Sequence, residues 1–251
     1  MADGLNEASP PGVLFKVHPS LQDFLVSPPV FTARHFAHGS SSLASGARNP
    51  DPTFLATGAI VFNRQLSPAR DGALAPPPRV LLIQRAPHDS MPLLWETPGG
   101  GCDDDDTTIL HACARELKEE AGLEATSVGP LVRCPATSVE VTTEDGPGKE
   151  RFKTAERMGC HLFFTRKRKL VYKFYFILEV KQTTEVVLDP AEHVAYLWAT
   201  EEEVRNERME GESGNDGIEL KFTTEEQRRV ILEAFKYWGK DTDGSQTVAY
   251  T

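Results

Sequence analysis

One stretch of the sequence decides the fold. It reads Glu-Thr-Pro-Gly-Gly-Gly at 96–101, four consecutive Asp residues at 103–106 and Arg-Glu-Leu-Lys-Glu-Glu-Ala-Gly-Leu at 115–123. The proline and glycines predict a tight loop, and the apolar spacing that follows predicts a helix over 107–121. The stretch therefore places a glycine-rich backbone directly before a helix that is rich in glutamate.

Two glutamates of the predicted helix lie at or inside its apolar face. At about 100° per residue, Glu120 falls among the apolar positions, Glu116 at their edge and Glu119 on the flank. The apolar positions are Ile109, Leu110, Cys113, Leu117 and Ala121. Unpaired carboxylates at the edge of a core are costly, and they repel each other when one turn apart. A divalent cation such as Mg²⁺ relieves both costs. A solvated acidic face is the competing interpretation. The position of Glu120 within the apolar face, together with the Pro-Gly-Gly loop just upstream in the sequence, favours the cation.

Strand-like apolar runs alternate with helical ones on both sides of this stretch. The predicted strands are 54–63, 79–84, 126–139, 157–165, 170–180 and 194–199. The run 170–180 is almost wholly apolar and aromatic, which is typical of a strand buried on both faces. The alternation predicts a mixed α/β sandwich over residues 53–240.

The segments outside that domain have a different composition. Residues 1–52 are predicted to be an N-terminal extension, and 241–251 a C-terminal tail. Apolar residues between Leu14 and Phe36 predict that this part of the extension packs on the domain. Residues 37–52 are small and polar, and they predict a mobile linker.

Composition and charge argue against several classes of partner and location. The 251 residues include 27 Lys and Arg against 37 Asp and Glu, and this net charge of −10 argues against a nucleic-acid binder. No apolar run approaches the roughly 18 residues of a membrane span. The N-terminus lacks the basic and apolar regions of a secretory signal. The four cysteines form no close pair, so we expect reduced thiols in a cytoplasmic protein.

The loop and helix together resemble the signature of the Nudix hydrolase superfamily. The Nudix box runs Gly, five residues, Glu, seven residues, then Arg-Glu-U-x-Glu-Glu-x-Gly-U, in which U is a bulky apolar residue. Here Gly101 is followed by five residues, then by Thr107 and seven more, and residues 115–123 match every specified position of the second half. A match of this length is improbable by chance.

The resemblance implies a Nudix-like α/β/α sandwich around a mixed β-sheet, and it implies an enzyme. The reaction would be Mg²⁺- or Mn²⁺-dependent hydrolysis of a pyrophosphate bond in a nucleoside diphosphate-linked or related organic pyrophosphate. The expected partner is therefore a small molecule. By position, Glu116, Glu119 and Glu120 become the metal ligands, and Arg115 holds the loop through a carboxylate. Gly122 would end the helix in a conformation open to glycine.

The sequence departs from the box at Thr107, where the family has its first Glu. A second alignment takes Gly100 as the box glycine, allows one inserted residue and brings Asp106 to that place. Because a buried guanidinium left alone is costly, we expect Arg115 to contact Asp105 or Asp106. Either the loop is reshaped around the Asp run, or the usual carboxylate is missing.

The general base of the family often lies outside the box, on a variable loop. Glu192, in the Asp-Pro-Ala-Glu-His turn before the strand 194–199, is one candidate and Glu140 is another. A surface role is the alternative for each. His161 and His193 have no ligand spacing to another histidine, so we expect them to serve packing or the surface.

Two other functions stay open on the sequence alone. The first is a Nudix-fold enzyme with non-hydrolytic chemistry, such as conversion of an isoprenyl diphosphate or a secondary metabolite, which Thr107 and the extension favour. The second is a non-catalytic module that binds a nucleotide-like ligand or a protein.

Overall fold

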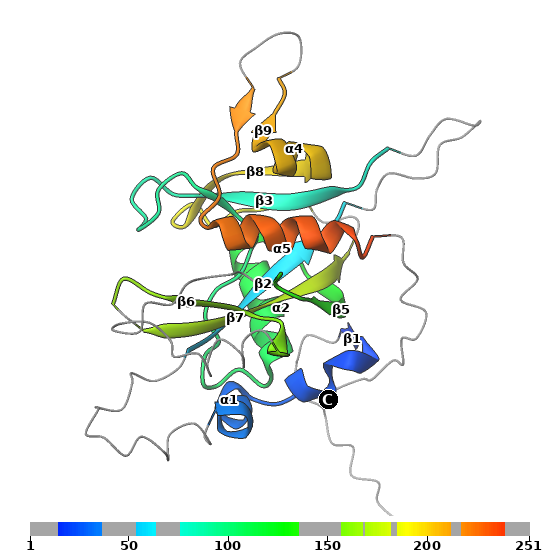
Figure 1. The fold of residues 1–251 in the computed structure, drawn as a ribbon, viewed down its shortest axis with the longest axis vertical. Helices are drawn as coiled ribbons and strands as arrows, with labels where there is room; N and C mark the ends of the chain where they lie inside the picture. Colours follow the sequence, from blue (N-terminus) through cyan, green and yellow to red (C-terminus); the bar gives the residue numbers. More distant parts are fainter. Residues whose placement is uncertain are drawn as a thin grey trace, which may run out of the picture.

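The computed structural model describes residues 15–36, 54–63, 76–135, 157–167, 169–181, 185–211 and 217–238 (Figure 1). Within these ranges no helix has the length and apolar character needed to cross a membrane. The elements in chain order are β1 (Lys16–Val17), the 3₁₀ helix η1 (Pro19–Phe24), α1 (Pro28–Phe36), β2 (Phe54–Val61), β3 (Arg79–Arg85), β4 (Trp95–Glu96), α2 (Ile109–Ala121), β5 (Ala125–Val132), β6 (His161–Phe164), β7 (Leu170–Val180), β8 (His193–Thr200), α4 (Glu201–Asn206), β9 (Arg208–Met209), β10 (Ile218–Glu219) and α5 (Glu225–Phe235).

The strands form a larger mixed sheet and a smaller antiparallel one. The larger sheet has the order β1-β5-β7-β2, and β6 also pairs with β7. Strand β7 runs parallel to β2 and antiparallel to β5 and β6. The smaller sheet has the order β4-β3-β8, and a bridge between Phe62 and Val80 joins it to the end of β2. A further pair, β9 and β10, stands apart from both sheets.

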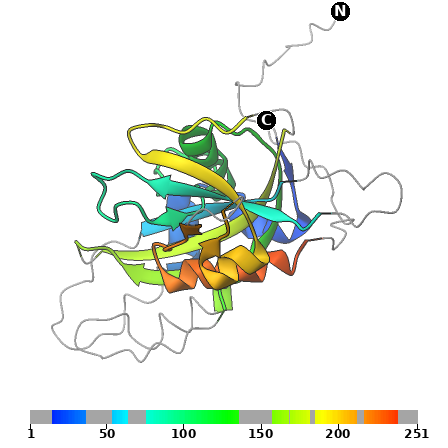
Figure 2. The same ribbon diagram turned by 90° about the horizontal axis from the view of Figure 1, so that it is seen from above.

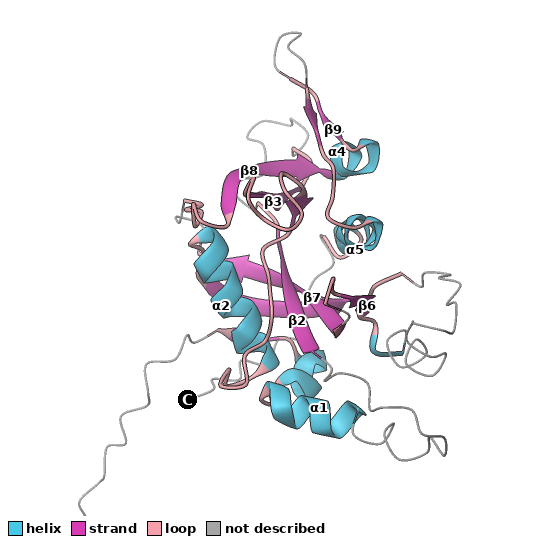
Figure 3. Ribbon diagram, turned by 90° about the vertical axis from the view of Figure 1, so that its left-hand side faces the viewer, coloured by secondary structure: helices cyan, strands magenta, loops and turns pink. Residues whose placement is uncertain are grey.

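Side chains along the central strands alternate between two hydrophobic cores. In β7, Phe174 and Phe176 belong to the core beneath α2, whereas Tyr175 belongs to the core beneath α5. Ala59 and Ile60 of β2 divide in the same way. Helices α2 and α5 lie on opposite sides of the strands (Figure 2, Figure 3). The predicted α/β/α sandwich is therefore confirmed, and β7 is buried on both faces because each face meets a different core.

The ends of α2 follow from its two caps. The hydroxyl oxygen of Thr108 accepts a hydrogen bond of 3.2 Å from the His111 N–H, so the helix begins at Ile109 and not at 107. Gly122 ends the helix with a φ of 68°, the left-handed conformation that favours glycine. The predicted C-terminal end of the helix is confirmed.

Two predicted strands are shorter in the structure. Strand β6 begins at His161 and not at 157, because Gly159 has a positive φ of 74° just before it. Strand β5 ends at Val132. The remainder of the predicted strand from 136 onward lies outside the described residues, as do the predicted linker at 37–52 and the predicted tail at 241–251.

Residues 15–36 pack into the core beneath α2. The ring of Phe24 meets the rings of Phe174 and Phe176 edge-on, with centroids 5.1 Å apart in each pair. Phe31 stacks on Phe24 at 5.2 Å and is 1% exposed. In Figure 3, α1 lies below α2 at the edge of the larger sheet. The apolar side chains of this segment thus cover β7, as the sequence predicts.

Truncation of Phe24 tests whether this segment belongs to the cooperative core. Phe24→Ala should lower the free energy of unfolding by about 3–4 kcal/mol, because it opens a cavity against β7. Val30→Ala is the control, since Val30 is 42% exposed and should change stability by about 0.5 kcal/mol or less. Urea denaturation measures both. Equal, small losses would show that the segment unfolds independently.

Candidate active site

Glu120 is the centre of the candidate site. It lies on the apolar face of α2, as predicted, and is 6% exposed. The Gly99 N–H donates a hydrogen bond of 2.6 Å to Glu120 Oε2, so the glycine loop and the helix meet at this carboxylate. Burial raises the pKa of Glu120 to about 8; the charges of Glu96 and Glu116 add to the rise, and the Gly99 hydrogen bond opposes it. The carboxylate is therefore costly to ionise unless a cation accompanies it.

Glu192 and His193 complete a cluster with Glu120. One ligand atom from each of the three residues lies within 4.8 Å of the other two. The carbonyl oxygen of Asp189 accepts hydrogen bonds from the N–H groups of His193, at 2.8 Å, and Glu192, at 3.1 Å. This turn presents Glu192 to solvent and buries His193. The part of the chain that the structure describes thus contains an acidic cluster with the spacing of a metal site.

A second set of polar contacts surrounds the imidazole of His193. Its Nε2 lies 3.4 Å from Glu96 Oε1 and 4.0 Å from Glu120 Oε1. Glu96 also accepts a hydrogen bond from Arg85, whose guanidinium donates two more to Asp89 at 2.9 and 2.7 Å. Arg85 therefore balances the charge of Glu96. Among the described residues, Glu120 has no Arg or Lys within ion-pair distance, and its contact is the His193 imidazole at 4.0 Å.

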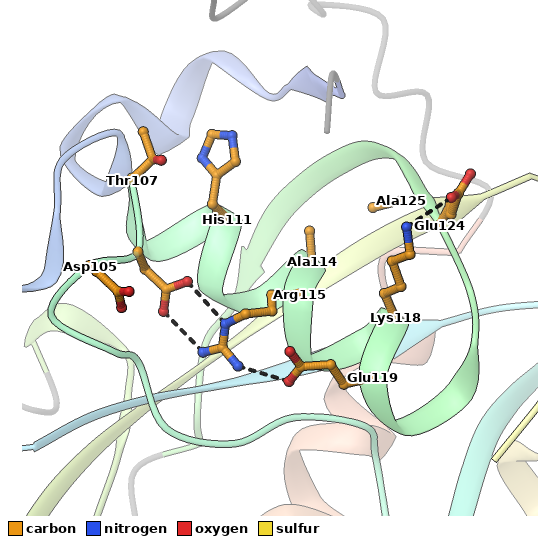
Figure 4. Close-up of a pocket in the computed structure, with 10 residues that line it drawn as sticks. Asp105, Thr107, His111, Ala114, Arg115, Lys118, Glu119, Glu124 and Ala125 are labelled. Atoms are coloured by element: carbon orange, nitrogen blue, oxygen red, sulfur yellow. Dashed lines mark hydrogen bonds and ion pairs between the residues drawn. The ribbon is translucent and has the colours of Figure 1, made fainter. Parts of the chain in front are cut away.

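Arg115 ties the Asp run to the helix. Its Nε and Nη2 donate to the two carboxylate oxygens of Asp106, at 3.1 and 3.0 Å. Its Nη1 donates to Glu116 and to Glu119, at 2.9 Å each. Asp103 adds a longer contact of 3.4 Å. Figure 4 shows the guanidinium between Glu119 and the acidic loop. The expected contact between Arg115 and the Asp run is confirmed, and the residue that makes it is Asp106.

The contacts of the loop favour the alignment that begins at Gly100. A Cβ atom on Gly100 would lie 2.6 Å from Glu116 Oε2, whereas a Cβ on Gly101 would meet nothing within 4 Å. Thr107 is exposed, and Asp106 engages Arg115 in its place. The loop is therefore reshaped around a carboxylate and does not lack one.

Paired substitutions test that assignment. Asp106→Asn should lower the free energy of unfolding by about 2 kcal/mol, because it weakens two charge-assisted hydrogen bonds to a partly buried guanidinium. Thr107→Glu should change it by about 0.5 kcal/mol or less, because Arg115 already has its partner. Urea denaturation of the two variants measures both changes in the free energy of unfolding. A clear gain in stability from Thr107→Glu would contradict the role given to Asp106.

A cavity of about 260 Å³ lies beside Arg115 (Figure 4), and Glu120 is not among its lining residues. The acidic loop, the outer flank of α2 and the start of β5 form its walls. Two ion pairs lie in its wall, since Lys118 Nζ lies 3.1 Å from Glu124 Oε1 and Arg115 binds Glu119. The cavity is therefore separate from the cluster at Glu120.

The sequence matches the family model of the NUDIX domain over residues 53–218, which is more than half of the chain. The chain belongs to the Nudix family. Many solved structures are similar to it, among them the following three. A MutT protein from Methanosarcina mazei Go1 is 19% identical, with 76% of this chain and 97% of that chain covered and a TM-score of 0.45. The NUDIX domain of Shewanella oneidensis NrtR, complexed with ADP ribose, is 15% identical, with 74% and 88% covered and a TM-score of 0.45. An ADP-ribose pyrophosphatase from Streptococcus suis 89-1591 is 19% identical, with 74% and 92% covered and a TM-score of 0.37. A comparison with curated proteins finds no match.

The structure of this Nudix domain separates the predicted site residues into two groups. It brings Glu120 and Glu192 together at the cluster. It directs Glu116 and Glu119 to Arg115, and the Glu119 side chain is 58% exposed. The other candidate base, Glu140, lies outside the described residues.

His193 and Glu96 are the residues of the site that the sequence does not reveal. The sequence assigns His193 to packing or the surface, whereas the structure places it between two carboxylates. The reason is a register shift between β3 and β8 at Gln84 and Arg85, since an irregularity of this kind re-aims a side chain. Glu96 follows Trp95 in a two-residue strand. Such a strand is too short for an alternation of apolar and polar residues to show which side chain is buried.

Proposed function

We propose that this protein hydrolyses a pyrophosphate bond in a nucleoside diphosphate-linked or related organic pyrophosphate, with Mg²⁺ or Mn²⁺ as cofactor. Membership of the Nudix family supports a Nudix-type hydrolase. The observation that carries the proposal is the buried, poorly compensated carboxylate of Glu120 beside Glu192 and His193. We also propose a cytoplasmic location, on the reduced cysteines that the sequence predicts.

The donor set at the cluster fits a hard divalent cation. Glu120 and Glu192 offer carboxylate oxygens, which Mg²⁺ and Mn²⁺ prefer, and His193 offers one imidazole nitrogen, which Mn²⁺ accepts more readily. Glu116 lies one turn before Glu120, and burial raises its pKa as well. We therefore assign Glu120 and Glu192 as ligands and Glu116 as a further one. Glu119, a metal ligand by its position in the box, accepts a hydrogen bond from Arg115.

The residues of the chain then divide the work of the reaction. When bound, the divalent ion supplies charge neutralisation at the phosphoryl oxygens and lowers the pKa of a coordinated water. The Glu192 carboxylate would hold the ion through one oxygen and accept a proton from the attacking water through the other, with Glu140 as the alternative base. The Gly99 N–H holds Glu120, and Arg115 holds the loop through Asp106. Bulk water is kept from Glu120 by its burial.

The ion pair between Arg115 and Asp106 also helps to choose among the candidate functions. Thr107, in place of the first Glu of the box, favours non-hydrolytic chemistry only if the loop has no other carboxylate to bind Arg115. Because Asp106 engages Arg115 through two hydrogen bonds, the hydrolase is favoured over the non-hydrolytic enzyme and over the binding module.

A substrate panel tests the proposal. Nucleoside diphosphate sugars, dinucleoside polyphosphates, nucleoside triphosphates and isoprenyl diphosphates are each incubated with Mg²⁺, with Mn²⁺ and with chelator, and products are separated by chromatography. We expect metal-dependent release of a phosphate or nucleotide from at least one pyrophosphate. In parallel, the ion should raise protein stability by about 2.7 kcal/mol at about a hundredfold excess over its Kd. Conversion of a substrate without cleavage of a pyrophosphate, or metal binding without turnover, would overturn the hydrolase.

A further inference from the structure

One face of the smaller sheet carries a row of side chains that begins at Glu96. Glu96 of β4 pairs with Ile83 of β3, and Ile83 pairs with Tyr196 of β8. Directly paired residues project their side chains from the same face of a sheet. Glu96, Ile83 and Tyr196 therefore form one row across the sheet, with Ile83 in the middle.

The irregularity between β3 and β8 brings His193 to the same face as Tyr196. On β3, Gln84 pairs with Ala195, and the next residue, Arg85, pairs with His193. One residue of β8 is therefore left without a partner on β3, and the alternation of side chains along β8 reverses there. His193 thus projects from the face that carries Tyr196.

The contacts of Glu96 agree with this assignment of the face. Arg85 donates a hydrogen bond to Glu96, and His193 Nε2 lies 3.4 Å from Glu96 Oε1. The same nitrogen lies 4.0 Å from Glu120 Oε1. Ligand atoms of Glu120, Glu192 and His193 lie within 4.8 Å of one another. This face of the smaller sheet therefore borders the acidic cluster.

Tyr196 is the exposed apolar member of its row. Ile83 is 0% exposed and belongs to the core beneath α2, whereas Tyr196 is 45% exposed on β8, at an edge of the sheet. Among the described residues, the Tyr196 hydroxyl group makes no hydrogen bond and its ring meets no other aromatic ring. Trp198 follows on the same face and packs against that core. The ring of Tyr196 is thus an open apolar surface beside the acidic cluster.

The spacing between Tyr196 and the cluster suits a nucleoside. Same-face neighbours along a strand lie about 7 Å apart, and one such step of the ladder separates Tyr196 from His193. Across the strands, two spacings of about 4.8 Å separate Tyr196 from Glu96. A single ribose joins the base of a nucleoside diphosphate to its phosphoryl groups. A base over Tyr196 therefore leaves those groups at the acidic cluster, whereas an isoprenyl diphosphate has no flat ring to place there.

We propose that Tyr196 stacks on the base of a nucleoside diphosphate whose phosphoryl groups lie at the cluster of Glu120, Glu192 and His193. This inference rests on the proposed function and narrows its substrate class to nucleoside diphosphate-linked compounds. Tyrosine suits the task because it offers a large, rigid ring at a low cost in conformational entropy. Every base has a π-face, so the Tyr196 ring favours a base without selecting which one.

A second copy of this chain is the competing occupant of the face, since β8 lies at an edge of its sheet. Such a pairing would bring two acidic clusters together in a chain whose net charge is −10, and repulsion between like charges opposes it. A stacked base is uncharged and leaves the cluster open to the metal ion and the phosphoryl groups.

The test uses two non-hydrolysable ligands that differ in the nucleoside. The methylene-bridged analogue of ADP carries a base, and methylenediphosphonate is its base-free counterpart. Calorimetry with the full chain in excess Mg²⁺ measures both affinities. Tyr196→Leu should weaken binding of the ADP analogue about tenfold, the order expected for one stacked base, and change binding of the base-free ligand about twofold or less. Tyr196→Phe keeps the ring and should bind both ligands as the wild type does.

Phe164→Leu is the matched control for Tyr196→Leu. Phe164 lies on β6 in the larger sheet, and its exposed fraction of 40% is close to that of Tyr196. Its replacement should leave both affinities unchanged. Circular dichroism and melting curves confirm that each variant is folded. With the best nucleotide substrate of the panel, Tyr196→Leu should raise KM about tenfold and change kcat about threefold or less.

Several results would overturn the stacking role of Tyr196. They are equal affinity of the ADP analogue in wild type and Tyr196→Leu, equal loss of both ligands in that variant, and a wild type that binds the base-free ligand as tightly as the analogue or binds neither. A dimer that Tyr196→Leu dissociates, measured by sedimentation, would assign the face to a second copy and would also overturn the proposal.

Failure of this inference is distinguishable from failure of the proposed function. A wild type that binds the ADP analogue through Tyr196 but hydrolyses no pyrophosphate overturns the hydrolase and leaves the base subsite standing. A wild type that hydrolyses base-free pyrophosphates and no nucleotide overturns the base subsite and leaves the hydrolase standing.

Discussion

Glu120→Gln is expected to lower turnover about 10³-fold, which corresponds to about 4 kcal/mol of lost transition-state stabilisation. Glutamine keeps the size of the side chain and still accepts the Gly99 hydrogen bond, so the loop stays in place. The charge that would hold the divalent ion is lost. Steady-state kinetics with saturating Mg²⁺, together with titration calorimetry of the metal, measure the effect. Glu124→Gln is the matched control, because Glu124 is exposed and pairs with Lys118 away from the cluster.

The same variant should become more stable than the wild type when metal is removed. The folded-state pKa of Glu120, about 8, lies above the ordinary value of 4.5. Between these values the folded protein binds more protons than the unfolded one, so the free energy of unfolding falls as pH rises from 4.5 toward 8. Glu120→Gln lacks this contribution, and Mg²⁺ should suppress it in the wild type. Melting curves across this pH range in chelator measure it. Two results would contradict the central role of Glu120. One is wild-type activity in Glu120→Gln, and the other is the same pH dependence of stability in the variant and the wild type.

Gly99→Ala should be the most destabilising single substitution in the loop, at about 4 kcal/mol. Gly99 has a φ of 145°, which a side chain rarely tolerates. A Cβ there would also collide with the carbonyl oxygen of Thr57 and lie 2.7 Å from the Cα of Gly58, and neither backbone group can rotate away. Displacement of Gly99 would also break the hydrogen bond from its N–H to Glu120, so metal affinity should fall together with stability.

Gly101→Ala provides the control for that result. It lies in the same loop, and its added methyl group would have open space around it. We expect a change in stability of about 0.5 kcal/mol or less. Denaturation with urea and calorimetry with Mn²⁺ measure both variants. If Gly99→Ala and Gly101→Ala behave alike, the close packing of the loop against the edge of β2 does not exist in solution.

The parts of the fold that the sequence predicts are those with strong local signals. The period of 3.6 along α2 places Glu120 on the buried face, and the two-faced apolar run of β7 identifies the central strand. Gly122 marks the helix end because the backbone there adopts the left-handed conformation, which favours glycine. These features depend on neighbouring residues, so a single sequence suffices to predict them.

The parts that escape prediction depend on contacts between distant segments. The environment of His193 follows from a register shift against β3, about a hundred residues earlier in the chain, and no local pattern encodes it. Glu96 becomes buried because Arg85 and His193 converge on it from two other strands. The choice between Gly100 and Gly101 as the box glycine requires the position of Glu116, which only the folded loop supplies.

The packing of Phe24 on β7 has a consequence for how the protein is made. At about 5–20 residues per second, the roughly 150 residues between Phe24 and Phe174 take on the order of 10 s to be synthesised. Strand β1 also waits for its partner, since Val17 pairs with Val128. During that interval the aromatic side chains of the early segment have no native surface to cover. We therefore expect the nascent chain to bind chaperones until β7 has left the ribosome. We also expect mutations that impair the last steps of folding to concentrate where η1 and α1 contact that strand.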